Sequence, residues 1–413
     1  MSDTAPGGTF RSLRVYNYRV WAGGAVVSNI GTWMQRTAQD WLVLTQLTHH
    51  NAAAVGIVMG LQFGPQLLWL PWTGSAADRF DKRRLLMLTQ AVMGFLALVL
   101  GLLTVTGQVR LWQVDVFAFL SGTAAAFDAP ARQTFVGELV GERDLSNAVS
   151  LNSTSFNGAR MVGPALAGVI IASVGTGWAF LLNGLSFIGV LFSLTLLRVG
   201  DLHGQARAGR GKGSFAEGVR YAWNRPDLRA ILIMLSLIGT FGLNFPIFIS
   251  TMAVRVFHAD AGGYGMLSSI MAVGTMSGAL FGASRGRVRF RSLLFGTAIF
   301  GAGCLAAAVS PGYWFFAAAL VVIGVAALIV TNATNSLMQL STEPAMRGRV
   351  MALRIGIALG GTFVGAPMVG WVADNWGPRW AMGVGAASGF AAAMVVAYAM
   401  LRRMHHGLTG PAV

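Results

Sequence analysis

Ionisable side chains inside long apolar segments are the residues of this sequence best placed to do chemistry. Arg36 and Asp40 stand four positions apart, the spacing of neighbours on one helix face. Asp115 lies in a separate apolar segment. A charge in such a segment is costly in lipid, and it is usually retained where it binds a proton, an ion or a counter-charge. We therefore predict proton binding at Asp40, paired with Arg36, with Asp115 as the other candidate carboxylate. The alternative for Arg36 and Asp40 is a permanent ion pair that pins one helix to its neighbour.

Polar residues follow two stripes at helical spacing. Asn29, Thr32 and Arg36 lie on one face of the first apolar segment, and Asn332, Asn335 and Gln339 repeat those intervals near the end of the tenth. Polar groups that faced lipid would lack hydrogen-bond partners, so these faces are predicted to point inward. Contact with a bound solute and contact between helices both remain open. The candidate set is Asn29, Thr32, Gln35, Asn244, Asn332, Asn335 and Gln339.

Enzyme and metal sites find little support. Gly211 and Lys212 are followed by Gly213, and residue 206 is Ala, so a phosphate-binding G-x-x-x-x-G-K-[ST] loop is incomplete. The six histidines show no H-x-x-x-H spacing, and the single cysteine, Cys304, lies in an apolar segment that suits packing. We predict no enzyme activity, no cofactor and no metal site.

These residues must be positioned by membrane helices. The chain has 413 residues, of which 54% are hydrophobic and 11% charged, against about 25% charged in soluble domains. That composition excludes an ordinary soluble protein, a disulfide-stapled secreted fold and a disordered chain. Apolar stretches of bilayer-spanning length predict twelve helices, all-α, at 20–47, 52–76, 85–107, 112–134, 146–174, 178–197, 230–254, 262–284, 292–310, 313–340, 350–373 and 380–401.

The formal charge of +15 indicates orientation in the membrane. Most of the 30 basic residues fall in predicted loops on the side of the N-terminus, so the positive-inside rule places both termini in the cytoplasm. We predict a multi-pass protein of a bacterial cytoplasmic (inner) membrane that contacts membrane lipids and binds no nucleic acid. No apolar stretch with a cleavage site precedes the first span, so no cleaved leader is expected.

The longest hydrophilic stretch, 198–229, divides the chain into predicted six-helix bundles at 1–197 and 230–413. Gly204 to Gly213 is rich in Gly and Arg, and a helix on the membrane surface is expected over 215–223, where apolar residues share one face. Five glycine pairs stand 202 positions apart, including Gly163 with Gly365 and Gly175 with Gly377. This spacing predicts a parallel repeat of the two halves.

The segment from Gly74 to Arg84 resembles the loop signature G-x-L-A-D-R-x-G-R-R of the major facilitator superfamily. It departs from that signature at Ala76 and Asp81. The resemblance implies that Asp78 caps the eleventh helix while Asp128 pairs with the Lys82/Arg83 run, and that together they latch the cytoplasmic gate shut in the outward-facing state. The gate residues carried over from this and the following motif are Gly74, Asp78, Arg79, Lys82, Arg83, Asp128, Arg132, Gly163, Pro164 and Gly168.

Ala159 to Gly168 resembles the G-x-x-x-G-P-x-x-G-G antiporter motif of exporters in this superfamily, with alanine at two of its glycines. A generic small-residue packing face is the alternative. The chain also resembles the bacterial branch that includes the enterobactin exporter, around 29–35, 126–133 and 145–168. An arginine in the middle of the fourth helix, common in the superfamily, is missing, which excludes proton coupling through that residue.

The resemblance implies a two-bundle fold with a central cavity and alternating access. We predict a monomeric, proton-coupled exporter of amphipathic small molecules, such as drugs or siderophore-like compounds. The alternative is an uncoupled or lipid-handling transporter, for example of lysophospholipids. A receptor or scaffold that transports nothing is a further alternative, which a flux assay in liposomes would separate.

Overall fold

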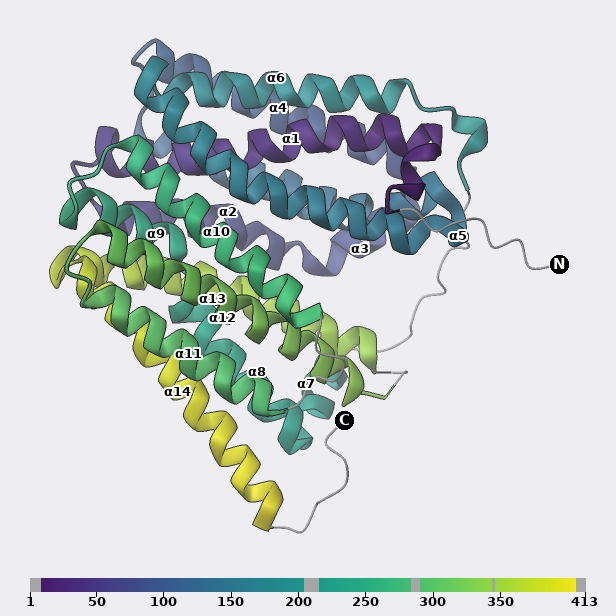
Figure 1. Cartoon of the computed structure of the whole chain (residues 1–413). Coiled ribbons are helices and arrows are strands. Elements are labelled where there is room, and N and C mark those ends of the chain that lie inside the picture. Colours follow the sequence, from purple (N-terminus) through teal and green to yellow (C-terminus); the bar gives the residue numbers. More distant parts are fainter. Residues whose placement is uncertain (1–8, 204–214, 284–289, 344–345, 406–413) are drawn as a thin grey trace. The chain divides into compact units, whose positions relative to one another are not determined.

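The computed structural model describes residues 9–203, 215–283, 290–343 and 346–405, without the side chains of 71, 74, 75, 77, 78, 215, 216, 280–283 and 403–405. Within these residues every regular element is a helix, as predicted (Figure 1). A helix satisfies its backbone hydrogen bonds internally, which is what apolar surroundings require of a chain so poor in charge.

The chain divides into two compact units. The first unit comprises residues 1–39 and 68–210, and the second comprises 40–67 and 211–413. The first unit holds most of α1 (Tyr16–Trp41), together with α3 (Leu70–Arg79), α4 (Lys82–Val105), α5 (Leu111–Val174) and α6 (Thr176–Thr195). The second unit holds α2 (Ala52–Leu68), α7 (Phe215–Asn224), α8 (Pro226–Leu237), α9 (Phe245–Thr251), α10 (Ala261–Ala283), α11 (Phe290–Ala308), α12 (Tyr313–Leu340), α13 (Arg347–Asn375) and α14 (Pro378–His405).

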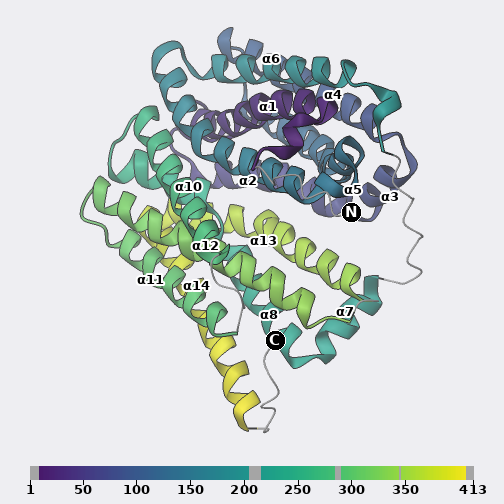
Figure 2. The same cartoon turned by 45° about the vertical axis from the view of Figure 1, so that its right-hand side comes forward.

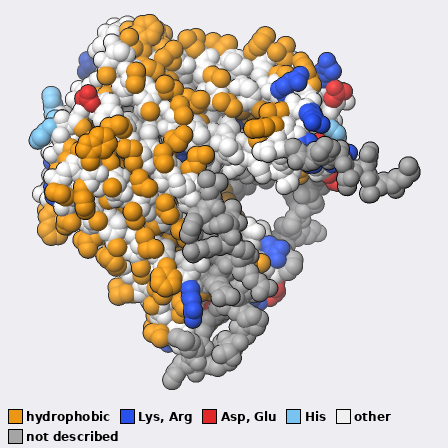
Figure 3. Space-filling model, viewed as in Figure 1, with side chains coloured by type: hydrophobic (Ala, Val, Ile, Leu, Met, Phe, Trp, Pro, Cys, Tyr) orange, Lys and Arg blue, Asp and Glu red, His pale blue; other side chains and the backbone are white. Residues whose placement is uncertain are grey.

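Eight helical segments of the described residues are long and apolar enough to cross a membrane. One of them, α5, contains two predicted spans in succession, because Gly141 adopts a φ of 67° and interrupts the helical backbone. Another covers Pro226 to Val256 and includes α8 and α9, with one π-helical turn at Ile238–Gly242 after α8 and a second at Met252–Val256 after α9. Hydrophobic side chains cover much of the described surface in Figure 3. The protein is therefore an all-helical membrane protein, and the count of twelve spans stays a prediction.

Small residues set the helix packing in the first unit. There α4 packs mainly against α6, and the two run side by side in both views (Figures 1 and 2). A Cβ added to Gly94 would lie 2.9 Å from the Cβ of Phe187, and one added to Gly184 would lie 2.5 Å from Leu98. The unit has its own apolar core, in which Tyr18 and Phe135 are fully buried.

The second unit follows the same packing pattern, with α11 against α14. A Cβ on Gly389 would lie 2.6 Å from the Cα of Gly301, so only glycine allows these backbones to approach so closely. A separate apolar core gathers around Leu228, Ile231 and Met338.

Two turns that the repeat relates have the same backbone conformation. Gly175 has a φ of 97° and Gly377 a φ of 98°, a left-handed region that glycine occupies without strain. Each residue is followed directly by a new helix, α6 or α14. This match between the positions supports the predicted parallel repeat.

Between the predicted bundles, α7 occupies the stretch where a surface helix was expected. Its Ala222 is buried whereas Trp223 is exposed, and Glu217 forms a salt bridge of 3.1 Å with Arg349 of α13. The predicted Gly/Arg-rich segment 204–213 lies outside the described residues.

Candidate functional site

Asp128, in the first half of α5, is the centre of a buried polar network in the first unit. Its Oδ1 accepts hydrogen bonds from Thr89 Oγ1 at 2.9 Å and from Gln90 Nε2 at 2.7 Å. Its Oδ2 pairs with Arg132, one helical turn later, at 2.8 Å. Arg132 also donates to Asn29 Oδ1 at 3.1 Å, so the network joins α1, α4 and α5.

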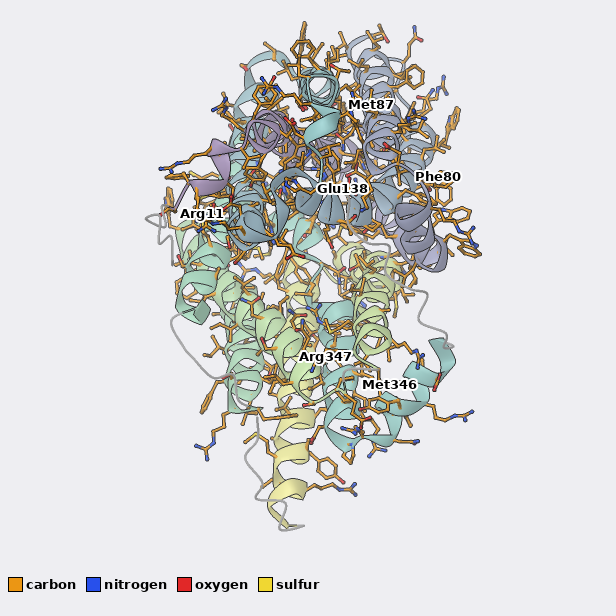
Figure 4. All side chains as sticks on the ribbon, turned by 90° about the vertical axis from the view of Figure 1, so that its right-hand side faces the viewer. Arg11, Phe80, Met87, Glu138, Met346 and Arg347 are labelled. Carbon is orange, nitrogen blue, oxygen red and sulfur yellow. The ribbon has the colours of Figure 1, made fainter. Side chains whose placement is uncertain are left out.

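Asp128 does not pair with the Lys82/Arg83 run in this structure. That pairing was expected of the outward-facing state, and it stays a prediction. Lys82 instead forms a salt bridge of 2.6 Å with Glu138 of α5, which is labelled in Figure 4. Arg83 donates through Nε to the carbonyl of Leu194 at 2.7 Å. The reason is position along the helix axis: Asp128 lies level with Thr89 and Gln90, which are about 10 Å further along α4 than Lys82 and Arg83.

The structure describes some of the other residues of the loop motif. Asp81, which stands where the superfamily pattern has glycine, caps α4 by accepting the Arg84 N–H at 2.8 Å. Arg79 ends α3 and is exposed. The side chain of Asp78 is not among those described, and neither are the surroundings of Gly74, so the predicted cap by Asp78 stays a prediction.

The antiporter-like motif lies at a close crossing of α5 and α1. A Cβ on Gly163 would lie 2.6 Å from the Cβ of Trp33 and 3.0 Å from the carbonyl of Ile30. In the second unit a Cβ on Gly365 would lie 1.6 Å from the carbonyl of Thr240. Pro164 and Gly168 are both buried in α5. Positions 202 residues apart thus mark equivalent close helix crossings, which fits the packing interpretation of this motif.

Asp40 belongs to the second unit, where it meets α10. It is 8% exposed, and its Oδ2 accepts a hydrogen bond of 3.2 Å from the Tyr264 hydroxyl. The neighbouring Trp41 ring stacks on Tyr264 with centroids 6.1 Å apart and planes 19° apart. Tyr264 is itself only 2% exposed. The predicted proton carrier is therefore a buried carboxylate with a tyrosine partner.

Asp374, near the end of α13, was missed by sequence reasoning. Its two oxygens accept the N–H groups of Ala52 and Ala53, each at 2.8 Å, and so cap the first turn of α2. Arg255 binds the same carboxylate at 3.0 Å and donates to the Ala373 carbonyl at 3.0 Å. The sequence did offer a signal. The chain has only 15 Asp and Glu residues, and Asp374 stands at the end of an apolar segment.

Close packing of α2 on α13 accompanies this cap. A Cβ on Gly56 would lie 2.4 Å from the Ala366 carbonyl, and one on Gly370 would lie 2.4 Å from the Ala52 carbonyl. Residues 40–67 come from the first half of the sequence, yet they belong to the second compact unit. The helix contacts and the cap by Asp374 explain this assignment.

Some of the remaining predicted residues hydrogen-bond to a neighbouring helix, and others are exposed. Gln35 accepts a hydrogen bond of 2.5 Å from Asn183 of α6, and Asn29 is held by Arg132, so both link helices. Asn244 is fully buried and donates to the Thr240 carbonyl at 2.7 Å.

Positions open to a solute are found mainly on α12. Asn332 and Gln339 are exposed on that helix. Asn335 is half-buried, and its Oδ1 accepts a hydrogen bond of 3.4 Å from Gln339 Nε2. Thr32 is half-buried on α1.

Asp115 is half-buried near the start of α5, and its Oδ1 has no hydrogen-bond partner within the described part of the chain. Arg36 lies over the Trp33 ring, 4.9 Å from its centroid. In the described ranges no three His, Cys, Asp or Glu side chains gather into a metal site.

Comparison with known proteins identifies what kind of protein carries these features. A family model described as transmembrane secretion effector matches residues 7–410. The staphyloferrin A transporter of Staphylococcus aureus is 35% identical over 169 residues, which cover 40% of this chain and 42% of that relative, less than half of its length. The multidrug efflux pump Tap of Mycolicibacterium fortuitum is 25% identical over 367 residues, covering 86% of this chain and 88% of the pump.

Solved structures show the same fold. A bacterial homologue of the human lysosomal transporter Spinster, in an inward-facing and occupied conformation, superposes with a TM-score of 0.73 at 15% identity, over 96% of this chain and 98% of that one. These relatives are transporters and not enzymes. With its match over nearly the whole length, the chain belongs to the transmembrane secretion effector family of the major facilitator superfamily.

Proposed function

We propose that this protein is a proton-coupled exporter of amphipathic small molecules that works by alternating access. It would span a bacterial cytoplasmic membrane twelve times as a monomer, with both termini in the cytoplasm. Support comes from the distribution of basic residues and from the efflux pumps among its relatives. A protein described as macrolide efflux protein A, from Streptococcus pyogenes, is a further relative at 20% identity over 83% of this chain.

The observation that carries the coupling proposal is the buried contact between Asp40 and Tyr264. With the N-terminus in the cytoplasm, α1 runs outward. A rise of 1.5 Å per residue from Val20 puts Asp40 about 30 Å along a hydrocarbon core of roughly 30 Å. The carboxylate would then lie at the outer mouth. When α1 and α10 part, Asp40 exchanges Tyr264 for water and takes a proton from outside, and re-formation of the contact follows release of that proton inward.

Asp374 would hold the outer gate shut in the conformation described here. Both the start of α2 and the end of α13 are outer ends in the proposed topology. The carboxylate that caps α2 and binds Arg255 ties those ends together, and the glycine contacts between α2 and α13 leave no room for a solute there. Opening toward the outside requires this cap to break.

Proteoliposomes with an imposed pH gradient test the coupling. Asp40→Asn keeps the shape of the side chain and cannot carry the proton, so gradient-driven accumulation of a drug should be abolished while drug binding stays intact. Asp260→Asn is the matched control, because Asp260 is another carboxylate of the second unit. Among the described residues its side chain accepts the Gly263 N–H at 2.8 Å, a bond that asparagine can keep. Unchanged coupled transport in Asp40→Asn would move the proton site elsewhere.

A lipid-handling transporter is the second candidate, and an apolar hollow in the second unit favours it. The hollow has a volume of 440 Å³ and is lined by Phe241, Pro367, Met368, Val369, Trp371, Val372 and Val384. A single acyl chain would fit such a lining. Lysophospholipid flux that needs no pH gradient and survives Asp40→Asn would favour this candidate over the proton-coupled exporter.

A further inference from the structure

Two guanidinium groups converge on one indole ring inside the first unit. Arg36 and Trp33 lie one turn apart on α1, and Arg160 reaches the same ring from α5. The Cζ of Arg36 is 4.9 Å and the Cζ of Arg160 is 5.3 Å from the Trp33 ring centroid. Phe156 meets Trp33 edge to face, with centroids 5.6 Å apart and an angle of 67°. The result is a cluster of two cations and two aromatic rings, called here the Trp33 cluster.

The antiporter-like motif produces this convergence. Gly163 stands directly against the Trp33 Cβ, which brings the backbones of α5 and α1 together. Arg160 precedes Gly163 by three residues and therefore shares its helix face. Any larger residue at position 163 would move Arg160 away from the ring. The motif thus positions a charge as well as packing two helices.

Arg160 brings a positive charge to the Trp33 cluster without a counter-charge among the described residues. Within those residues it forms no salt bridge and no hydrogen bond, and it contacts the Trp33 ring. Asp128 binds Arg132, and Asp115 forms no ion pair with a described base. A guanidinium in an apolar helix normally faces a counter-charge. The cation–π contact with Trp33 leaves the N–H donors of Arg160 without an acceptor among the described residues.

The Trp33 cluster is partly exposed as well as basic. Arg36, Arg160 and Trp33 are half-buried, and Phe156 is 46% exposed. A guanidinium presents parallel N–H donors that match the two oxygens of a carboxylate, whereas the rings offer flat apolar surface beside it. The arrangement suits a molecule in which an oxyanion is joined to an apolar body.

We propose that the Trp33 cluster is a binding subsite for the oxyanion of an exported carboxylate-bearing amphiphile, with Arg160 as its main ligand. This inference rests on the proposed function and adds the chemical class of a substrate. Arg160 binds the carboxylate, and Trp33 with Phe156 packs on the apolar body.

A pair of probes that differ only in charge tests the subsite. The full-length protein in nanodiscs of zwitterionic lipid is titrated with 11-(dansylamino)undecanoate and with its methyl ester, and dansyl fluorescence reports binding. The native protein should prefer the acid by about tenfold or more, the scale of one charge-assisted pair. Arg160→Gln should remove that preference and leave affinity for the ester unchanged. Arg160→Lys, which keeps the charge and loses the planar fork, should fall between them.

Arg198→Gln is the matched control. Arg198 lies in the same unit and also stacks on a ring, 4.3 Å from the centroid of Tyr16, and its tie to Asn17 uses backbone atoms that the substitution retains. It removes one charge and one cation–π contact, so it should keep the preference for the acid. A preference that survives Arg160→Gln, or equal loss of acid and ester, would overturn the proposal.

Two further arms separate the possible failures. Phosphatidylglycerol added to the nanodiscs competes with the acid if the site takes a lipid headgroup, and displacement that depends on Arg160 would overturn the assignment to an exported solute. Gradient-driven export is measured separately with the ester and the acid. If the native protein exports neither, the proposed function fails while the binding preference still reports on the subsite.

Discussion

Asp374 shows how one carboxylate can hold several backbone groups at once. It accepts two N–H groups of α2 and the guanidinium of Arg255, so its removal leaves three donors without their acceptor. Helix caps contribute about 0.5–2 kcal/mol, and a charge-assisted hydrogen bond about 1.5–3 kcal/mol. Replacing Asp374 should therefore cost more stability than replacing an exposed residue beside it.

We expect Asp374→Ala to lower the thermal unfolding midpoint and to open the outer side. The measurement is thermal unfolding in detergent, together with the rate at which a maleimide labels Ala53→Cys in a Cys304→Ala background. Labelling should be faster when Asp374 is replaced, because the cap no longer holds α2 to α13.

Asn375→Ala is the control for this substitution. Asn375 is exposed and donates only to the Trp371 carbonyl of its own helix, at 2.9 Å. It should leave both the midpoint and the labelling rate near native values. An unchanged midpoint and labelling rate in Asp374→Ala would show that the cap contributes nothing to closure.

At the scale of helices, glycine position decides which helices touch. Two glycines of α5 differ sharply in surroundings although they stand five residues apart. A Cβ on Gly163 would meet the Trp33 Cβ at 2.6 Å, whereas one on Gly158 would meet nothing within 4 Å. The same substitution should therefore have opposite effects at the two positions.

Gly163→Ala should destabilise the protein by roughly 1–3 kcal/mol, the usual cost of overpacking. Gly158→Ala should be neutral or stabilising by up to about 1 kcal/mol, because alanine favours the helix. Thermal unfolding of the two purified variants checks this. Equal midpoints would mean that α1 and α5 are not held together at Gly163.

At the scale of the whole molecule, the distribution of charge predicts orientation. The net charge of +15 gathers in loops on one predicted side, and the insertion machinery retains such loops in the cytoplasm. Arg347, labelled in Figure 4, opens α13 and belongs to that set.

Single cysteines in a Cys304→Ala background should report this orientation. Ser2→Cys should react with a membrane-impermeant maleimide only after the cells are permeabilised, while Gly312→Cys should react in intact cells. The reverse pattern would invert the topology and place Asp40 and Asp374 on the cytoplasmic side.

Features that depend on neighbouring residues could be predicted from the sequence. Apolar length predicts helices, and the left-handed turns at Gly175 and Gly377 follow from residue type and spacing. The helix α7 formed where its apolar face was recognised. Membership of the superfamily was likewise indicated by residues near Gly74 and Gly163. Such properties are local, because they need only the residue types along a short stretch of chain.

Which partner each charged residue meets was decided by the tertiary structure. Asp128 binds Arg132 and two side chains of α4 in place of Lys82, because it lies about two turns further along α4 than the basic start of that helix. Asp374 caps a helix 322 positions earlier in the sequence. A charge pair needs atoms within about 4 Å, and a rotation of one residue about a helix axis moves a side chain farther than that. The sequence by itself therefore determined the helices and the family, and packing determined the contacts that the proposed mechanism uses.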